Sequence, residues 1–463
     1  MVRFVCLTLL AALAVTLSAT AASGERDSAT FDRAKALALG IDSTCALTDE
    51  GGVKCWGYNG HGELGNGQSP SNRSIPTSNV IGLVRGVIAI TAGVRHHCAL
   101  TAEGAVKCWG ADYEGALGTG TTEIPGGPVT VSGVTGASAI SAGHDFSCVL
   151  VGGGVECWGD NSQGMLGNGT KESGPAPVRV LGLGSGVTAI ESDYLQSCAL
   201  LTDGGVRCWG GLFGTEPVQI AGLNGGAKAI TSRCALMTDG GVECWNGTKT
   251  AADVPGLSGI RSISTGAGSA CALGSTGGVK CWGDNEHGQL GNGTTSDSAE
   301  PVDVSGLRSG VAAVATSGVH SCAVMKSGAA RCWGAGGVGQ LGNGSTSDRS
   351  RPVGVIDLGP PKAKLSILSG SVRVTSTGTA PTSVRCGADA GCRGTLMLVG
   401  FGSRVFTIKP GRTKVVAVKL TIRGLRRVMR AKRLQTQARA VYEQPDASRT
   451  TRTRTVILVA PKR

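Results

Sequence analysis

Short apolar runs separated by polar, glycine-rich stretches recur along most of this chain. One full unit begins with the β-branched run VIAITA (87–92), and a turn leads to HCALT (97–101) and AVKCWG (105–110), which a glycine-containing loop joins. A polar loop then leads to PVTVSG (128–133), whose proline stands where a strand tolerates it best. Each unit therefore predicts four short strands with a central hairpin. No unit carries an apolar period of 3.6 over a helix length, which excludes a helical solenoid.

Seven such units follow one another. Their first cysteines stand 36 to 53 residues apart, and each tryptophan of the chain directly follows a unit's second cysteine, at Trp56, Trp109, Trp158, Trp209, Trp245, Trp282 and Trp333. Glycine, 76 of 463 residues, suits the many tight turns between short strands. Four strands per repeat are typical of propeller blades. The pattern predicts an all-β fold with a seven-bladed β-propeller at 36–358, in which the tryptophans pack between blades, and stacking on a ligand is the alternative role for them.

The pattern changes after a proline linker at 359–363. Further β-like runs predict a small β-sandwich of about 100 residues at 364–463. The runs are KLSILSGSVRVTST, GTLMLVGF, RVFTI, TKVVAVKLTI and RTVILVA. Within this region CGADAGCRGTLML (386–398) resembles the C-terminal immunoglobulin-like modules of secreted actinobacterial proteins. That resemblance implies a fold and brings no activity with it.

The first residues have the pattern of a targeting segment. Arg3 is followed by an apolar run from Phe4 to Leu17 and by the small residues Ala19-Thr20-Ala21. We expect a signal peptide at 1–22 and a linker at 23–35. The alternative, a membrane anchor, is disfavoured because the run has only about 14 residues and a span needs about 20. The mature chain is expected to be secreted or held at the cell envelope, monomeric and not membrane-spanning.

Export to an oxidising compartment would favour disulfide bonds between the cysteines. Removing Cys6 with the signal peptide leaves 16 of the 17 cysteines, and an oxidising compartment favours disulfides. Zinc is disfavoured because no unit offers further ligands at the required spacing, and free buried thiols are the remaining alternative. Cysteines placed opposite each other in a hairpin lie close to disulfide reach. We expect eight local bridges: Cys45–Cys55, Cys98–Cys108, Cys148–Cys157, Cys198–Cys208, Cys234–Cys244, Cys271–Cys281, Cys322–Cys332 and Cys386–Cys392.

Two stretches carry a resemblance to a known family. TAGVRHHCALTAEGAVKCWG (91–110) and WGDNEHGQLGNGT (282–294) resemble the regulator of chromosome condensation repeat, of the secreted bacterial type with paired cysteines. The resemblance implies seven blades of about fifty residues over 36–358. It also implies two activities, guanine-nucleotide exchange on a small GTPase and, in secreted members, inhibition of hydrolases. The family's histidine stands at His320 and His96, and its replacement in other units indicates a structural role.

Units four and five differ from the others. The tryptophan and the proline that opens the fourth strand are 8 and 10 residues apart in these units, against 19 or 20 in the other five. This shortening indicates either decay of the repeat or a gap that admits a partner. In the second case Leu212 and Phe213 would lie at the trimmed edge, with Phe213 as an exposed anchor. The partner would also contact variable residues of the long loops, namely Tyr58, His61, Tyr113, Glu114, Gln163, Glu286 and His287.

Charge divides the chain near the linker. Residues 362–463 hold 22 Lys and Arg against 3 Asp and Glu, a net charge of +19, whereas the remainder holds 22 and 29, a net charge of −7. Such a field attracts polyanions. Because the chain is expected to be exported, envelope polymers or acidic lipid headgroups are better matches than nucleic acid, and few aromatic residues accompany the charge. A solvated basic surface is the alternative. The candidate polyanion-binding residues are Arg423, Arg426, Arg427, Arg430, Lys432 and Arg433.

No motif of a catalytic, metal or cofactor site stands out. The chain has no GxSxG sequence, no glycine-rich loop before a helix and no recurring group of His, Asp and Ser. We therefore expect no enzymatic activity and no cofactor. The leading prediction is a secreted binding platform that engages an unknown protein or glycan through the propeller loops. Nucleotide exchange and hydrolase inhibition are the alternatives.

Overall fold

The computed structural model describes most of the chain from residue 32 onward. The described residues are 32–76, 79–122, 126–223, 226–245, 247–358, 365–375, 377–386, 392–409, 412–443 and 449–461. The predicted signal peptide at 1–22 and the proline linker at 359–363 lie outside them. The first strand begins at Ala34, inside the segment predicted as the linker 23–35.

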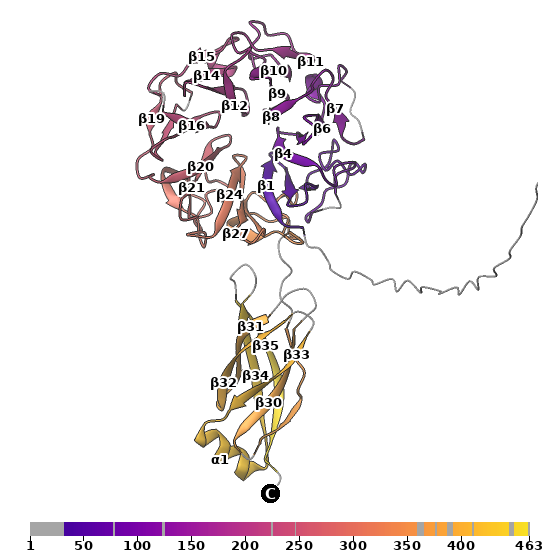
Figure 1. The fold of residues 1–463 in the computed structure, drawn as a ribbon, viewed down its shortest axis with the longest axis vertical. Coiled ribbons are helices and arrows are strands. Elements are labelled where there is room, and N and C mark those ends of the chain that lie inside the picture. Colours follow the sequence, from indigo (N-terminus) through magenta and orange to yellow (C-terminus); the bar gives the residue numbers. More distant parts are fainter. Residues whose placement is uncertain are drawn as a thin grey trace, which may run out of the picture. The chain divides into compact units, whose positions relative to one another are not determined.

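Seven small antiparallel sheets form a ring (Figure 1). Six of them have four strands in sequence order, and the first has three. Figure 1 shows the first strand of each sheet nearest the centre, as in propeller blades. The structure thus confirms the all-β propeller prediction, and the sheets are called blades one to seven in chain order.

The strands of each blade are short. Blade one holds β1 (Ala34–Leu39), β2 (Ser43–Thr48) and β3 (Val53–Gly57), blade two β4 (Val87–Ala92), β5 (His96–Thr101), β6 (Val106–Gly110) and β7 (Val129–Thr130), and blade three β8 (Ala137–Ala142), β9 (Phe146–Val151), β10 (Gly154–Gly159) and β11 (Gly174–Arg179). Blade four holds β12 (Val187–Ser192), β13 (Ser197–Leu201), β14 (Val206–Trp209) and β15 (Val218–Gln219), and blade five β16 (Ala227–Ile230), β17 (Cys234–Met237), β18 (Val242–Cys244) and β19 (Ala252–Asp253). Blade six holds β20 (Ile260–Thr265), β21 (Ser269–Gly274), β22 (Val279–Gly283) and β23 (Ser298–Asp303), and blade seven β24 (Val311–Thr316), β25 (His320–Met325), β26 (Ala330–Gly334) and β27 (Arg349–Gly354). Two short 3-10 turns accompany them, η1 (Tyr113–Gly115) and η2 (Gly211–Phe213).

Hydrophobic clusters between neighbouring blades hold the ring together. Each cluster combines strand residues of one blade with the tryptophan of the next, as in the cluster of Leu47, Val53 and Trp109 between blades one and two. The ring closes in the same way, because Trp56 of blade one packs with Leu341 and Val355 of blade seven. Six of the seven tryptophans are fully buried in these clusters. They therefore pack between blades, as predicted.

All eight predicted disulfides are present. In each blade the two cysteines pair directly across the hairpin, with Cα atoms 4.0 or 4.1 Å apart. The eighth bridge joins Cys386 to Cys392, with Cα atoms 5.8 Å apart. In blade three the turn is one residue shorter, yet Cys148 and Cys157 still face each other. Opposition across the hairpin therefore explains the seven pairings within the blades, whereas the eighth bridge joins β30 to β31, which lie in different sheets.

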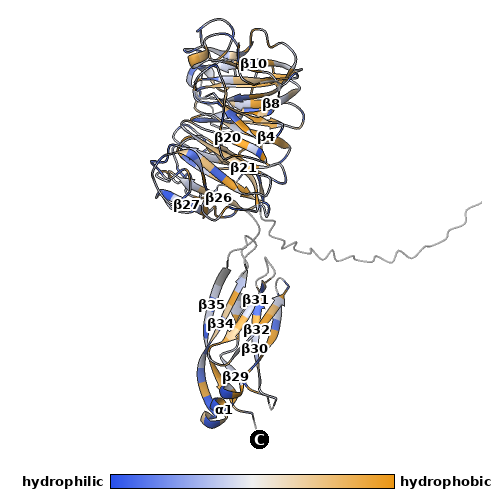
Figure 2. Cartoon of the chain, turned by 90° about the vertical axis from the view of Figure 1, so that its left-hand side faces the viewer, coloured by the Kyte–Doolittle hydropathy of each residue, from blue (hydrophilic) through white to orange (hydrophobic). Residues whose placement is uncertain are grey.

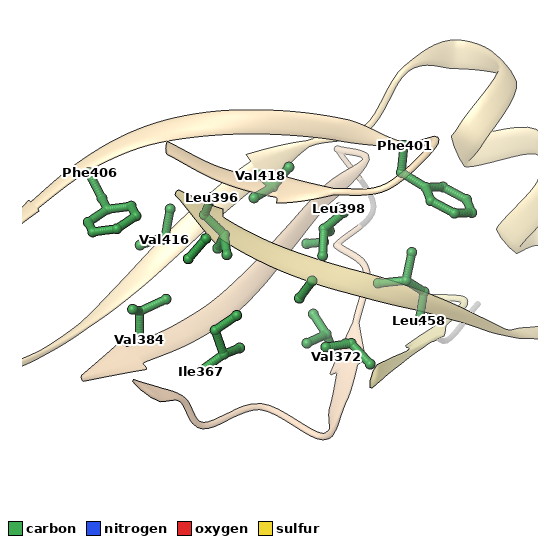
Figure 3. Packing of buried hydrophobic residues seen from close by; sticks show 14 of the residues in the cluster. Ile367, Val372, Val384, Leu396, Leu398, Phe401, Phe406, Val416, Val418 and Leu458 are labelled. Atoms are coloured by element: carbon green, nitrogen blue, oxygen red, sulfur yellow. The ribbon is translucent and has the colours of Figure 1, made fainter. Parts of the chain in front are cut away.

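Residues 365–461 form two sheets around one hydrophobic cluster. Figure 3 shows Leu396, Leu398, Val416 and Val418 of this cluster pointing toward one another. One sheet has the order β28 (Leu365–Ile367), β30 (Thr379–Cys386), β33 (Thr413–Lys419), and the other has the order β29 (Ser371–Arg373), β35 (Arg449–Val459), β34 (Arg433–Glu443), β31 (Cys392–Leu398), β32 (Gly402–Ile408). The pairing of β29 with β35 is parallel and the others are antiparallel. The immunoglobulin-like assignment stays a prediction.

One helix, α1 (Ile422–Ala431), lies within the basic run and was not predicted from the sequence. The Thr421 hydroxyl caps it by accepting the backbone N–H of Gly424 at 3.1 Å. Val428 is buried against the domain, whereas most of the helix is hydrophilic, as Figure 2 shows. The helix ends where Lys432 takes a φ of 57°. The basic run is therefore an amphipathic helix lying on its own domain.

Candidate binding surface on the loop face

One end of the propeller collects the long loops. Because neighbouring strands are antiparallel, the turn between a blade's first and second strands and the loop between its third and fourth strands emerge at the same end. We call this end the loop face. The first-to-second-strand turns lie at its centre and the third-to-fourth-strand loops lie at its rim, since the first strands are innermost (Figure 1). Binding residues on propellers belong to such loops, because the strands are committed to packing.

Backbone hydrogen bonds connect the central turns into part of a circle. The amide of Ile41 donates to Val94, that of Val94 to His144 and that of His144 to Tyr194, over 3.2 to 3.4 Å. Beside them lies a hollow of about 100 Å³, lined by turns of every blade except blade five. The His144 ring packs edge-on against Tyr194, with ring centroids 4.4 Å apart. The centre of the loop face is thus an ordered and partly aromatic depression.

Blade five interrupts this circle. Its turn is reduced to Thr231–Arg233, so it supplies no counterpart to Tyr194. Arg233 instead reaches back to blade four, where its Nε donates to Asp193 Oδ2 at 2.7 Å. The Asp193 side chain is 7% exposed, and its second carboxylate oxygen is buried without a partner. A partly buried ion pair therefore joins blades four and five where the backbone circle is open.

Glu191 stands on β12 near this interruption. At the same register the other blades carry small residues, and Thr91, Ser141 and Ser264 each accept a backbone N–H from the next blade. Glu191 makes no such contact among the described residues, and solvent reaches its side chain. Surrounding protein nevertheless raises the pKa of Glu191 to about 7 through desolvation. The carboxyl group therefore titrates near neutral pH.

Three predicted loop residues meet between blades one and two. The Tyr113 hydroxyl shares a 2.9 Å hydrogen bond with His61 Nε2, and Tyr58 lies 6.1 Å from the same imidazole ring. His61 Nδ1 lies 3.1 Å from the buried carboxylate of Glu63, which can only accept. In the neutral ring the proton is thus on Nδ1, and Nε2 accepts from Tyr113. Because Tyr113 is 40% exposed, this group presents an aromatic surface on the rim.

The other predicted loop residues do not join this group. Glu114 and Gln163 are exposed on blades two and three, and Glu114 has a φ of 52°. Glu286 is exposed on blade six, and His287 Nδ1 lies 3.1 Å from Asp348 Oδ2 of blade seven. These residues are spread around the rim rather than gathered into one site.

The prediction of an exposed anchor at Phe213 is wrong. Phe213 is 5% exposed and packs with Cys208, Ile220 and Trp245 between blades four and five, whereas its neighbour Leu212 is 75% exposed. Other interblade clusters hold a leucine of the long loop, such as Leu64 or Leu290. Phe213 takes over that role because blade four lacks the long loop. The trimmed edge of blade four is therefore closed by its own phenylalanine.

Replacing Phe213 should destabilise the protein. We expect Phe213→Ala to lower the free energy of unfolding by about 3–5 kcal/mol, because it empties a packed interblade position. Leu212→Ala is the matched control and should change it by less than about 0.5 kcal/mol, since its side chain is in solvent. Chemical unfolding of the two variants measures both values. Equal stability of the two variants would contradict the packing role.

The partial exposure of the tryptophan of blade six was not predicted from the sequence. Trp282 is the one tryptophan that is only partly buried, and it lines a hollow of about 380 Å³. The shortened loop of blade five could have indicated this exposure. In five other pairs of blades, the corresponding long loop covers the tryptophan of the next blade. Shortening in one unit thus exposes a residue of the following unit.

The histidines at the family position are buried between blades. His96 Nε2 shares a 2.8 Å hydrogen bond with Ser147 Oγ, and His320 Nε2 does so with Thr44 Oγ1. Burial lowers the pKa of His96 to about 4 and that of His320 to about 3. A third ring, His97, bonds Ser43 Oγ at 2.8 Å, and burial lowers its pKa to about 3. These neutral rings join neighbouring blades.

The predicted polyanion-binding residues lie on and beside α1. All six side chains are exposed: Arg423, Arg426, Arg427, Arg430, Lys432 and Arg433. The guanidinium of Arg427 lies 5.4 Å from the centre of the Phe401 ring, which fixes its position. The helix thus displays clustered positive charge. Within the described part of the chain, no helix has the length and apolar character needed to cross a membrane.

Comparison with protein families identifies the repeat. Residues 50–100, 103–150 and 276–324 match the model for the regulator of chromosome condensation (RCC1) repeat, and a second model of the same description matches 34–63, 87–116 and 260–289. The chain is 35% identical over 100 residues to the mitochondrial RCC1 domain-containing protein RUG3 of Arabidopsis thaliana, covering 21% of this chain and 22% of that protein. It is 36% identical over 127 residues to the secretion-regulating guanine nucleotide exchange factor of Bos taurus, covering 25% and 26%. The chain therefore spans about a quarter of the length of these relatives.

Two solved structures align with most of this chain. Human WBSCR16 aligns over 71% of this chain and 83% of its own, with 20% identity and a TM-score of 0.45. Prp20p from Saccharomyces cerevisiae aligns over 86% and 85%, with 21% identity and a TM-score of 0.44.

Proposed function

We propose that this chain, which belongs to the regulator of chromosome condensation repeat family, is an exported, non-enzymatic binding platform that engages a protein or glycan through its loop face. The observation that carries the proposal is the division within each blade. Six of the seven indole rings and the blade disulfides are committed to the interior, while the loop face displays aromatic side chains such as Tyr113 and Tyr194. Eight buried disulfides support an oxidising, extracellular setting.

The basic C-terminal region is proposed to hold the protein to anionic polymers of the cell envelope. Residues 362–463 carry a net charge of +19, and the exposed arginines of α1 are a dense part of it, where several can contact one polymer. Exposed charges interact over a Debye length of about 8–10 Å at physiological salt, so this attachment should be weakened by salt. Contacts of the loop face, which combine rings and hydrogen bonds, should resist salt better.

Guanine-nucleotide exchange is the alternative. The similarity to the secretion-regulating guanine nucleotide exchange factor favours it, although the match covers 26% of that protein. This activity needs a cytosolic GTPase, whereas the paired cysteines favour an oxidising compartment. We therefore place the binding platform first.

Two full-length variants separate the two attachments. Arg423→Gln/Arg426→Gln/Arg430→Gln removes three charges from α1 and keeps good helix formers, and His61→Ala/Tyr113→Ala removes the aromatic group of the rim. On immobilised envelope fractions at low salt, we expect the α1 variant to bind about 150-fold more weakly, since three charges at about 1 kcal/mol each amount to about 3 kcal/mol. The rim variant should lose the part of the retention on envelope fractions that persists at high salt.

Each variant is the control for the other. A further variant, Arg393→Gln/Arg404→Gln/Arg439→Gln, removes the same charge from exposed strand positions. An equal loss with this variant would mean that net charge alone drives retention. Unchanged salt-resistant retention in the rim variant would contradict the role assigned to the loop face.

A further inference from the structure

A recurring contact shows what covers the tryptophans. In five places a segment of one blade's long loop, of the form x-Leu-Gly, lies over the tryptophan of the next blade. The carbonyl of residue x accepts the indole N–H at 2.8 or 2.9 Å, and the leucine enters the interblade cluster. The segments are Glu63–Gly65, Ala116–Gly118, Met165–Gly167, Gln289–Gly291 and Gln340–Gly342.

The glycine of this segment is required by contact with the indole. A Cβ atom on Gly291 would lie 2.6 Å from Trp333 Nε1, and one on Gly118 would lie 2.7 Å from Trp158 Nε1. Both glycines also have positive φ, 67° and 71°. We call the space over each tryptophan, between its blade and the preceding one, the slot. The slot therefore accepts a carbonyl, then a leucine and then a residue without a side chain, in this order.

Blades four and five lack the long loop, with different results. In blade four Phe213 fills the cluster, and Trp245 donates its N–H to Ser232 of its own blade at 3.1 Å. In blade five, no described residue between the third and fourth strands enters the cluster of Leu257 and Ile260. Trp282 lies partly exposed at its edge.

The slot between blades five and six is consequently open. It forms the hollow of about 380 Å³ lined by Trp282, Arg233, Ser269 and Thr265. Among the described residues, no acceptor receives the Trp282 indole N–H, and the buried hydroxyl of Thr265 has no partner. Thr265 also lines the central hollow, so the slot adjoins the centre of the loop face. The slot thus offers an aromatic ring, an apolar edge and two unused donors.

We propose that the slot between blades five and six binds a turn of a partner protein that presents an x-Leu-Gly segment. The partner's carbonyl accepts from Trp282, its leucine packs toward Cys234 and Ala270, which line the slot, and its glycine lies on the indole ring. The chain itself supplies five examples of this match, so the occupant is defined by chemistry that already operates in the fold. The inference rests on the proposed binding role of the loop face and names the partner's recognition element.

The probe is the chain's own loop supplied as a separate molecule. A backbone-cyclised peptide of residues 284–297 contains Gln289-Leu290-Gly291. In the protein Asn285 closes this loop by donating its side-chain amide to the carbonyls of Thr294 and Ser296, at 3.2 and 2.8 Å, so the cycle is preorganised. The peptide is titrated into full-length protein while the indole N–H signals are followed by NMR. The Trp282 signal is assigned from its loss in Trp282→Phe.

We expect the Trp282 signal to shift and saturate with a Kd of about 0.1–1 mM, while the six buried indoles stay unchanged. Acrylamide quenching of Trp282 should fall in parallel. A control peptide carries Leu290→Asp and Gly291→Val, and it should give no saturable shift. Equal shifts from both peptides, or none from the first, would overturn the proposal.

A chito-oligosaccharide tests the other class of ligand, because sugars also stack on exposed indoles. A shift of Trp282 with the sugar and none with the peptide would refute the peptide proposal. The probes are synthetic, so this outcome is independent of retention on envelope fractions. If the peptide does not bind, the proposal that the loop face is a binding platform still stands. If retention on envelope fractions fails, the titration still reports whether the slot binds an x-Leu-Gly segment.

Discussion

Reduction of the disulfides is expected to unfold the propeller. Each of its seven bridges closes a loop of nine or ten residues and stabilises the fold by about 2–3 kcal/mol through the entropy of the unfolded chain. Together they contribute on the order of 15–20 kcal/mol, against a net stability of about 5–15 kcal/mol for a typical domain. The short strands, several of two residues, offer few ladder hydrogen bonds in compensation.

The measurement must allow for burial of the bridges. The propeller cysteines are at most 6% exposed, so reductant reaches them only after unfolding. The chain is therefore reduced in guanidinium and returned to buffer with and without the reductant, and near-ultraviolet circular dichroism reports the tryptophan environments. We expect native signal only in the reoxidised sample, with the eight bridges found by non-reducing peptide mapping. A native spectrum in the reduced sample would show that the blades fold without their bridges.

Acidification is expected to destabilise the protein steeply below pH 6.5. His96, His97 and His320 have folded pKa values of about 4, 3 and 3, against 6.5 when unfolded. Between these values only the unfolded chain binds the protons, so stability is complete above pH 6.5 and is lost as the pH falls toward 4. Each histidine costs about 1.4 kcal/mol per pH unit in this window, or about 4 kcal/mol per unit for the three. Glu191 acts in the opposite direction, because its raised pKa stabilises the folded state at low pH. The exposure of the Glu191 side chain to solvent reduces that contribution.

Repeat neighbours supply the variants for this test. Blade four carries Gln196 at the register of His96 and His320, and its side-chain amide donates to the carbonyl of Ser232 at 2.7 Å. In guanidinium unfolding between pH 7.5 and 4.5, His320→Gln should lower the slope of stability against pH by about 1.4 kcal/mol per unit. The double variant with His96→Gln should lower it by about twice as much. An unchanged slope would mean that other groups control the acid response.

Much of the fold follows from the sequence because its signals are local. The alternating strands around 87–110, the paired cysteines and the following tryptophan all lie within one hairpin, so neighbouring residues determine them. The seven blade bridges were predictable, since opposition across a turn depends only on the length of that turn, whereas Cys386 and Cys392 lie on strands of different sheets and their pairing followed only from their closeness in the sequence. The rim group of Tyr58, His61 and Tyr113 was predicted as variable loop residues, but its geometry needs two blades.

The C-terminal region was less readable. The strands β30 and β34 were missed although both alternate buried and exposed positions, because small or polar residues such as Ala438 and Thr436 occupy the buried side. The helix α1 was missed because its apolar positions are few. The helix is stabilised by the packing of Val428 and by the Thr421 cap, and its sequence shows no strong apolar period.

Sequence alone determined the repeat, its strands, the covalent pairing and the two-sided charge of the chain, because each depends on spacing along the chain. Only the tertiary structure decided which residues are exposed at the trimmed blades. The shortened loops of units four and five look equivalent in the sequence. In the structure, Phe213 turns inward and closes the slot between blades four and five, whereas Trp282 stays partly exposed in the slot between blades five and six. The cover of each tryptophan comes from the preceding blade, so its exposure is fixed by contacts between repeats and not by its own sequence.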